Sequence, residues 1–105
     1  MIARTWRGVT ASEDAESYLR YLQETGFSEY RRSPGNLGVV CLQHTQGDRA
    51  EFLLVSFWES EDAAVAFAGG DPSRAVFYPE DDRFLVERDE HVRHHRVGHA
   101  DLHGL

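Results

Sequence analysis

Lysine is absent from the 105-residue chain, whose 11 basic residues are all arginine. A Schiff base between a lysine amine and a carbonyl substrate is therefore excluded, as is a lysine general base. Acidic residues number 18, so the formal net charge is −7 at pH 7. Because an acidic chain has no overall field that attracts nucleic acid or anionic lipid, we expect neither as a partner.

Cysteine occurs once, so an internal disulfide is excluded. Cys41 lies in the apolar run of residues 39–42, which favours a buried structural thiol over a reactive one. No apolar stretch reaches the ~20 residues of a membrane-spanning helix. The first residues also lack the charged-then-apolar pattern of an export signal. We therefore expect a cytoplasmic protein without a membrane partner.

A strand and a helix are predicted in the first third of the chain. Residues 2–9 alternate weakly between apolar side chains and arginine, as a strand does. Ser12 is followed by two carboxylates, a pattern typical of a helix N-cap. Apolar residues then recur at helical spacing until Gly26, which is a plausible end of the helix. Residues 31–36 contain a proline followed by glycine, which predicts a loop.

A hairpin and a second helix are predicted next. The apolar runs 37–44 and 50–58 are separated by turn residues, so we expect them to pair as antiparallel strands. Ser60 precedes two carboxylates and is predicted to cap a helix that ends at Gly69 and Gly70.

The last third is predicted to be less regular. Asp71 and Pro72 suit a short turn that carries residues 76–78. The acidic run 80–82 is interpreted as a solvated loop, and a last strand is expected from about residue 90 to residue 98.

The order strand, helix, strand, strand, helix, strand predicts an α+β fold. Its compact solution is the ferredoxin-like split βαβ arrangement (βαββαβ) with an antiparallel sheet. The first and third strands then lie at the centre, and both helices cover one face. We expect one domain over residues 1–98, followed by a polar tail over residues 99–105.

The third predicted strand is apolar on both faces. These faces carry Leu53, Val55 and Phe57 on one side, and Phe52, Leu54 and Trp58 on the other. Helices can cover only one face in a chain of this length, so the other face must meet a partner or a ligand. The pattern therefore predicts a homodimer.

Two segments resemble the antibiotic biosynthesis monooxygenase superfamily. These are Trp58-Glu59-Ser60 with the downstream aromatic Phe67, and the turn Phe77-Tyr78-Pro79-Glu80-Asp81. The resemblance implies a dimeric α+β barrel with a cavity in each subunit between sheet and helices. It is weakly specific for activity, because the superfamily includes oxygenases and haem-degrading enzymes.

The haem-degrading branch can be tested residue by residue. The resemblance implies an asparagine on the first strand, a tryptophan on the second helix and a histidine ligand shortly after it. The first strand here contains no asparagine, the helix tryptophan falls on Phe67, and the iron ligand falls on Phe77. Since phenylalanine cannot bind iron, we expect no haem degradation; Tyr78 as a substitute axial ligand is the remaining route to it.

The resemblance to cofactor-independent oxygenases of the superfamily implies a site without haem. They need a dry aromatic pocket, a proton acceptor, and a donor or cation that holds a developing anion. We assign the proton acceptor to His94, the anion-holding cation to Arg4, and a further catalytic role to Tyr78. The expected pocket walls are Trp6, Trp58, Phe67 and Phe77.

Each assignment has an alternative. The aromatic side chains are about as well explained by core packing. Tyr78 could simply pack a turn, and Arg4 could pair with a carboxylate such as Glu51 at an interface.

The histidine-rich end of the chain does not predict a metal site. In an extended strand His91, His95 and His99 share one face, but neighbours four residues apart are ~13 Å apart, too far for one ion. His94 lies on the opposite face. We expect a solvated, pH-sensitive tail and neither metal nor other cofactor.

These features predict a homodimeric small-molecule protein. The leading hypothesis is a cofactor-independent monooxygenase that acts on a phenolic or polyketide-like substrate. A non-catalytic binding or protective module is one alternative, and a non-redox isomerase or cyclase on the same scaffold is another.

Overall fold

A five-stranded antiparallel sheet organises the computed structural model, which describes residues 1–69, 71 and 73–104. The strands are β1 (Ile2–Ala11), β2 (Asn36–Gln46), β3 (Arg49–Trp58), β4 (Leu85–Arg88) and β5 (Arg93–Arg96). Their order is β2-β3-β1-β4, and β5 also pairs with β1. The predicted central position of the first and third strands is confirmed, as is the hairpin of β2 and β3.

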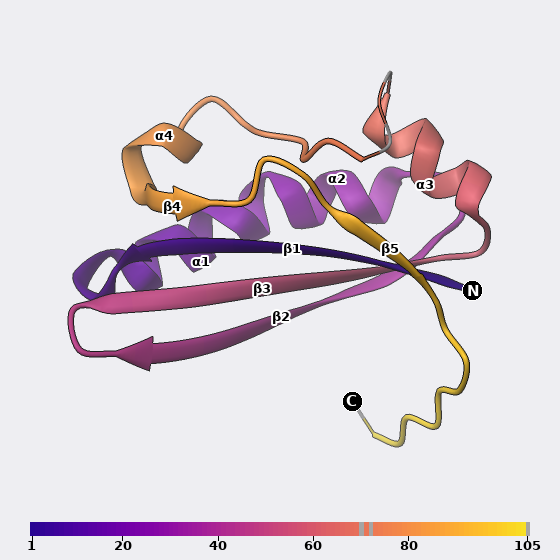
Figure 1. Ribbon diagram of the computed structural model, residues 1–105, viewed down its shortest axis with the longest axis horizontal. Helices are drawn as coiled ribbons and strands as arrows, with labels where there is room; N and C mark the ends of the chain where they lie inside the picture. Colours follow the sequence, from indigo (N-terminus) through magenta and orange to yellow (C-terminus); the bar gives the residue numbers. More distant parts are fainter. Residues whose placement is uncertain (70, 72, 105) are drawn as a thin grey trace.

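The helices are short. They are the 3-10 turn η1 (Ser12–Asp14), α1 (Ala15–Glu24), α2 (Gly26–Arg32), α3 (Glu61–Ala68) and α4 (Asp81–Phe84). In Figure 1, α1 and α2 follow one another nearly in line along the sheet. Within the described residues, no helix is long and apolar enough to cross a membrane.

The pairing of β1 with β3 decides which side chains face the helices. Arg4 is opposite Ser56, and Trp6 is opposite Leu54. Ser56 and Leu54 are both buried. Residues directly opposite each other in an antiparallel pair share a face, so Arg4 and Trp6 lie on the helix-covered face. The other face, which we call the open face, is covered by no helix and carries the alternate residues of the strands.

The core is an aromatic cluster between α1 and β3. Tyr18 contacts Phe52 edge to face, with ring centroids 5.0 Å apart, and packs on Phe84 at 5.5 Å. Each of these rings removes a large apolar area from water, which makes the cluster a main source of stability. Cys41 packs against the same cluster, and burial raises the pKa of its thiol to about 11. The thiol therefore stays protonated at neutral pH, as expected of a structural cysteine.

Gly26 does not end the helical segment as predicted, because it begins α2. The chain bends at Thr25, whose hydroxyl donates to the carbonyl of Tyr21 at 2.7 Å, and then continues helically to Arg32. The loop, which was predicted to start at residue 31, therefore starts at Ser33.

The two predicted N-caps have different outcomes. The Ser60 hydroxyl accepts a hydrogen bond from the amide of Ala63 at 3.2 Å, so this cap is confirmed. Ser12 caps nothing, because it lies inside the 3-10 turn that starts after Ala11. The predicted helix end falls partly on Gly70, and the predicted turn partly on Pro72; both residues lie outside the described ones. The described Asp71 accepts hydrogen bonds from the amide and hydroxyl of Ser73.

The acidic run is not a solvated loop. Asp81 begins α4, is 4% exposed, and accepts a hydrogen bond from the amide of Tyr78 at 2.6 Å. Its own amide donates back to the carbonyl of Tyr78 at 3.0 Å. The reciprocal pair fixes the turn over Pro79 and Glu80 and brings the carboxyl group into the interior.

The predicted last strand over residues 90–98 is shorter than expected, because only β5 (Arg93–Arg96) is regular there, and β4 (Leu85–Arg88) is a further strand that was not predicted. β4 and β5 both pair with β1, and the chain between them bulges away at residues 89–92. The indole of Trp6 donates to the carbonyl of Asp89 at 2.7 Å, and the amide of Asp89 donates to the carbonyl of Arg7 at 2.9 Å. Residues 97–104 have no regular structure and extend away from the sheet (Figure 1).

Candidate functional site

A small cavity lies between the helix-covered face of the sheet and the helices. Its lining comprises Arg4, Trp6, Tyr18, Leu22, Gly26, Tyr30, Leu54, Ala75, Val76, Tyr78, Asp81 and Val92. Its volume is about 30 Å³, room for about two water molecules. An aromatic ligand can therefore enter only if part of this wall moves. Residues 75–78 form no helix or strand and are the least regular part of the wall.

Arg4 is the cation of the cavity. It is 3% exposed, and its Nη2 donates to the carbonyl of Arg74 at 3.0 Å. The guanidinium also lies 5.7 Å from the centroid of the Phe67 ring, on its face. Burial lowers the pKa of Arg4, while the nearby phenols of Tyr30 and Tyr78 raise it. An arginine remains charged at neutral pH under such a shift, so the cavity holds a buried positive charge.

The alternative pairing of Arg4 with Glu51 does not occur. Glu51 lies opposite Val9 on the open face and forms an ion pair with Arg7, at 2.6 Å between Nε and Oε2. The sheet therefore separates Arg4 from this carboxylate.

His94 lies behind Arg4 and not in the cavity wall. Its Nε2 is 3.3 Å from Nη1 of Arg4. Because a guanidinium can only donate, Nε2 is the acceptor, and the neutral ring carries its proton on Nδ1. Burial and the charge of Arg4 lower the pKa of His94, although Glu61 opposes them. The imidazole is therefore held neutral, as a proton acceptor must be.

Tyr78 lines the cavity and carries a buried hydroxyl group. Its Oη is buried and, among the described residues, forms no hydrogen bond. Burial raises the pKa of Tyr78, so the phenol is protonated and can donate. Leaving a buried donor unpaired costs about 1–3 kcal/mol. Such a group is suited to bonding a molecule that enters the cavity.

Trp6 closes one side of the cavity. Its ring meets Phe77 edge to face, with centroids 6.2 Å apart. A Cβ atom at Gly8 would lie 2.4 Å from the Trp6 ring, so only glycine leaves room for the indole at this place. Phe77 itself is not part of the wall; it packs between Trp6 and the guanidinium of Arg88, which lies 4.7 Å from its centroid.

Trp58 and Phe67 form an aromatic cluster behind Arg4. Their centroids are 5.2 Å apart, and Tyr30 packs on Phe67 at 4.8 Å. The Trp58 indole donates to the hydroxyl of Ser56 at 3.0 Å. These two residues therefore pack and support Arg4 rather than line the cavity.

The structure brings the seven predicted site residues into one region but gives them different places. Arg4, Trp6 and Tyr78 line the cavity, while His94, Phe67, Phe77 and Trp58 lie one layer behind it. Among the described residues, no three potential metal ligands gather.

Sequence reasoning missed one row of lining residues. Tyr18, Leu22, Gly26 and Tyr30 all line the cavity and are spaced four residues apart. Residues four apart share one face of a helix, so the row was visible in the sequence once the helix was allowed to continue past Gly26. Asp81 was also missed, because a run of three acidic residues predicts a solvated loop.

Comparisons with known proteins agree with this architecture. The model of the antibiotic biosynthesis monooxygenase family matches residues 9–77. Among solved structures, a protein described as an antibiotic biosynthesis monooxygenase from Bacillus cereus is similar, with a TM-score of 0.68 and 13% identity over 97% of each chain. One from Nitrosomonas europaea has a TM-score of 0.63 and 15% identity over 94% of this chain and 100% of its own.

A third similar structure is the haem degrader MhuD from Mycobacterium tuberculosis with two haems bound. Its TM-score is 0.60 and its identity 20%, over 98% of this chain and 100% of that one. At these identities the structures show the fold alone. No curated protein matches the chain. The family model covers well over half of the sequence, and the chain belongs to the antibiotic biosynthesis monooxygenase family.

Proposed function

We propose that this protein binds a small phenolic or polyketide-like molecule in the cavity and oxidises it with molecular oxygen. Membership of the family points to small-molecule binding or monooxygenase-like chemistry. The observation that carries the finer proposal is the buried cation Arg4 between a neutral histidine and an unpaired tyrosine hydroxyl. Such a site favours an acid that enters as a phenol and is held as its anion.

The proposed roles follow from the contacts. The oxygen of the substrate accepts from the Tyr78 hydroxyl and from Arg4, which exchanges its bond with His94 for one with the developing anion. Because His94 lies behind Arg4, its Nε2 takes the phenolic proton only after Arg4 has turned toward the anion and opened the way to it. An electron-rich phenolate can itself reduce oxygen, and the balanced reaction converts a phenol and O₂ into a quinone and water. The surrounding rings exclude water from the anion.

Haem does not fit these residues. The candidate iron ligands near the cavity are His94, whose Nε2 is engaged by Arg4, and Tyr78, whose pKa is raised by burial so that the phenol stays protonated. The position implied for the iron ligand holds Phe77, packed on Trp6. We therefore expect added haemin to show no shift of its Soret band.

Oxygen uptake tests the proposal. Purified protein is incubated with a panel of polycyclic phenols that carry hydrogen para to the hydroxyl group, and oxygen consumption, quinone absorbance and hydrogen peroxide are followed together. Turnover that stops under anaerobic conditions and yields one quinone per O₂ without hydrogen peroxide supports oxygenation. Turnover that continues without oxygen identifies an isomerase or cyclase instead. A ligand that binds and is recovered unchanged identifies a binding module.

His94→Ala tests the assignment of the proton acceptor. Because acid–base groups typically contribute ~100-fold or more, we expect kcat to fall by about that factor while the dissociation constant of the substrate changes little. An equal loss in both quantities would reduce His94 to a residue that positions Arg4.

A further inference from the structure

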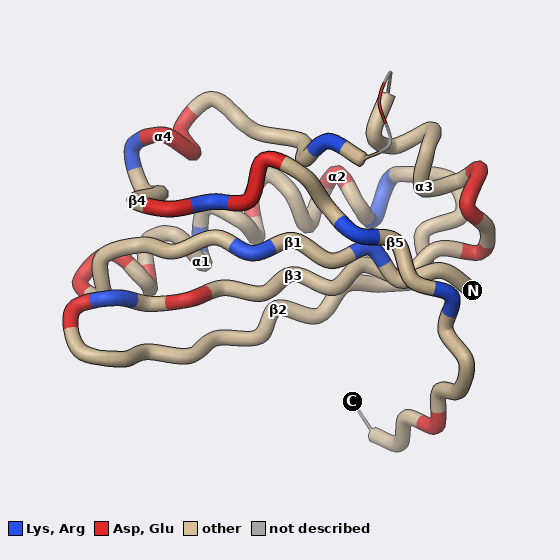
Figure 2. Tube along the Cα trace, in the orientation of Figure 1, with Lys and Arg blue, Asp and Glu red and all other residues tan. Residues whose placement is uncertain are grey.

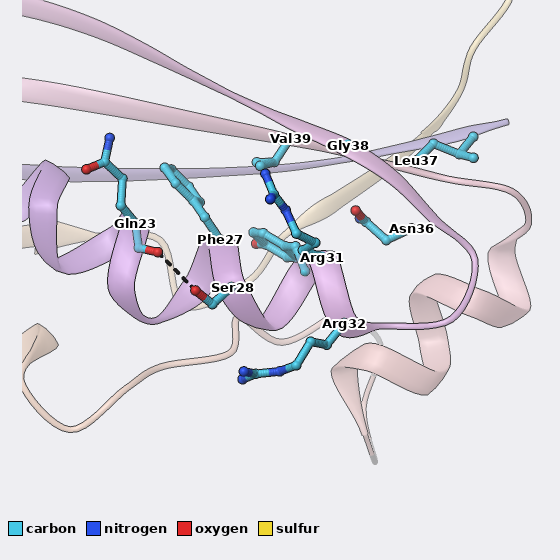
Figure 3. Close-up of a pocket in the computed structure, with 10 residues that line it drawn as sticks. Gln23, Phe27, Ser28, Arg31, Arg32, Asn36, Leu37, Gly38 and Val39 are labelled. Atoms are coloured by element: carbon cyan, nitrogen blue, oxygen red, sulfur yellow. Dashed lines mark hydrogen bonds between the residues drawn. The ribbon is translucent and has the colours of Figure 1, made fainter.

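A second, larger hollow lies at the edge of the sheet, in a groove between α2 and β2 (Figure 3). Its volume is about 850 Å³, within the ~300–1,000 Å³ typical of small-molecule sites. The groove is lined by Gln23, Phe27, Ser28, Tyr30, Arg31, Arg32, Asn36, Leu37, Gly38 and Val39. Tyr30 also lines the cavity, so this one side chain separates the groove from the site described above.

Arg31 supplies an available positive charge in the groove. Figure 3 shows its side chain reaching toward β2 beside Val39, whereas Arg32 points away. Arg32 is paired with Glu29, at 2.6 Å between Nη2 and Oε2. Within residues 1–69, 71 and 73–104, no carboxylate lies within ion-pair distance of the Arg31 guanidinium. In a chain with net charge −7, an arginine left without an acidic partner beside a hollow is suited to an anion from outside.

The rest of the groove has a mixed lining, in which Phe27, Leu37 and Val39 are apolar and Gln23, Ser28 and Asn36 are polar. Phe27 contributes an aromatic ring that also packs on the core cluster, and Leu37 is 54% exposed. Leu37 belongs to a bulge of β2, because the pairing with β3 shifts between Asn36 and Gly38. Gly38 has φ of +148°, and a Cβ atom there would meet nothing within 4 Å. Bare backbone therefore forms part of the floor, over which a planar molecule can lie closely.

We propose that this groove is a binding site for a planar aromatic anion, such as an aryl carboxylate or sulfonate. The charged group pairs with Arg31, and the ring lies over Gly38 between Phe27 and Leu37. The groove goes beyond the proposed oxidation, because binding here requires neither Arg4 nor oxygen chemistry. Its common wall with the cavity makes it a place where a ligand waits beside the inner site.

A matched pair of fluorescent probes tests the proposal. 1-Anilinonaphthalene-8-sulfonate is an aromatic anion with a planar naphthalene ring, and N-phenyl-1-naphthylamine is the same skeleton without the sulfonate. In titrations of the full chain, Arg31→Gln should weaken binding of the sulfonate probe about five-fold, the upper range for an exposed ion pair. It should leave the neutral probe unchanged. Arg20→Gln, at an exposed position of α1 outside the groove, should change neither. Leu37→Ala should weaken both probes alike.

Two further outcomes separate this site from the cavity. Tyr78→Phe alters the cavity alone and should leave the sulfonate probe unaffected. If Tyr78→Phe weakens the probe and Arg31→Gln does not, the probe occupies the cavity, and the groove proposal fails while the proposed function stands. The groove proposal is also overturned if the sulfonate probe does not bind, or if Arg31→Gln and Arg20→Gln have equal effects.

Discussion

At the scale of single residues, the cavity contains a tyrosine hydroxyl that costs stability. Tyr21 and Tyr78 show the contrast, because both are tyrosines against the same turn. The Tyr21 hydroxyl accepts from the amide of Glu80 at 3.0 Å, whereas the Tyr78 hydroxyl is buried without a partner among the described residues. A folded protein tolerates an unpaired buried donor when the donor serves a ligand.

Tyr78→Phe should therefore stabilise the protein and lower its affinity for the proposed ligand. Removal of an unpaired buried hydroxyl should raise the free energy of unfolding by about 1 kcal/mol. Tyr21→Phe is the matched control, and it should lower the free energy of unfolding by a similar amount, since a bonded hydroxyl is lost. Urea denaturation of the three proteins measures both effects. Destabilisation by both substitutions would mean that Tyr78 donates to a partner within the protein.

The lowered pKa of His94 predicts a pH dependence of stability. The unfolded ring titrates near 6.5, and the folded ring titrates below that because of burial and Arg4. Between the two values the unfolded chain binds more protons, so the stability that His94 contributes is present above about pH 6.5 and is lost as the pH falls through the folded pKa.

We expect His94→Gln to flatten this dependence. Urea midpoints are compared at pH 7.5 and pH 5.5 for the wild type, for His94→Gln, and for His95→Gln, whose ring is exposed on the opposite face. The wild type should lose more stability than His94→Gln on going to the lower pH, and the flattening should be smaller in His95→Gln. Equal slopes in all three proteins would contradict a depressed pKa for His94.

At the scale of secondary-structure elements, the sequence predicted the helices and strands that local patterns of neighbouring residues indicate. β1, the hairpin of β2 and β3, and α3 were found because alternation, turn residues and a serine cap act over neighbouring positions. The same local evidence predicted the helix face with Tyr18 and Leu22. It also put the seven site residues into one region, through the resemblance and the strand order together.

What could not be predicted depends on contacts between distant segments. Gly26 has no side chain to signal that it begins a second helix, and a Cβ atom there would lie 3.7 Å from the ring of Tyr78, more than fifty residues away. Asp81 is buried because its turn packs against α1, where the hydroxyl of Tyr21 accepts a hydrogen bond from the amide of Glu80. The break between β4 and β5 follows from the bonds of Asp89 with Trp6 and Arg7. Patterns of neighbouring residues in the sequence do not reveal such contacts between distant segments.

The two serine caps give a matched test at this scale. Ser60→Ala removes the hydroxyl that bonds the amide of Ala63 and should destabilise the protein by about 1 kcal/mol. Ser12→Ala removes a hydroxyl that caps no helix and should stay within about 0.5 kcal/mol of the wild type. Chemical denaturation measures the free energy of unfolding of both variants. A larger loss for Ser12→Ala than for Ser60→Ala would contradict the helix start seen in the structure.

At the scale of the whole molecule, the open face of the sheet lacks a cover. Leu42 is 50% exposed there and neighbours the half-buried side chains of Leu53 and Val55. Figure 2 shows that β2 carries no charged residue along its full length, while charges gather on the neighbouring strands and turns. Natural sheets usually protect such a strand with charge or with a covering segment. We therefore propose that a second copy of the chain covers this uncharged, apolar face.

A single charge should separate the two copies. In a two-fold dimer each substitution occurs twice at the same interface, so Leu42→Glu places two buried carboxylates close to each other or against apolar side chains. Sedimentation equilibrium should then find a monomer where the wild type is a dimer. Ala66→Glu adds the same charge at an exposed position of α3 and should leave the dimer intact. Because Leu42 is half-exposed in the monomer, the fold should survive, and circular dichroism checks that it does. A wild type that sediments as a monomer, or two variants that behave alike, would show that the open face is not the interface.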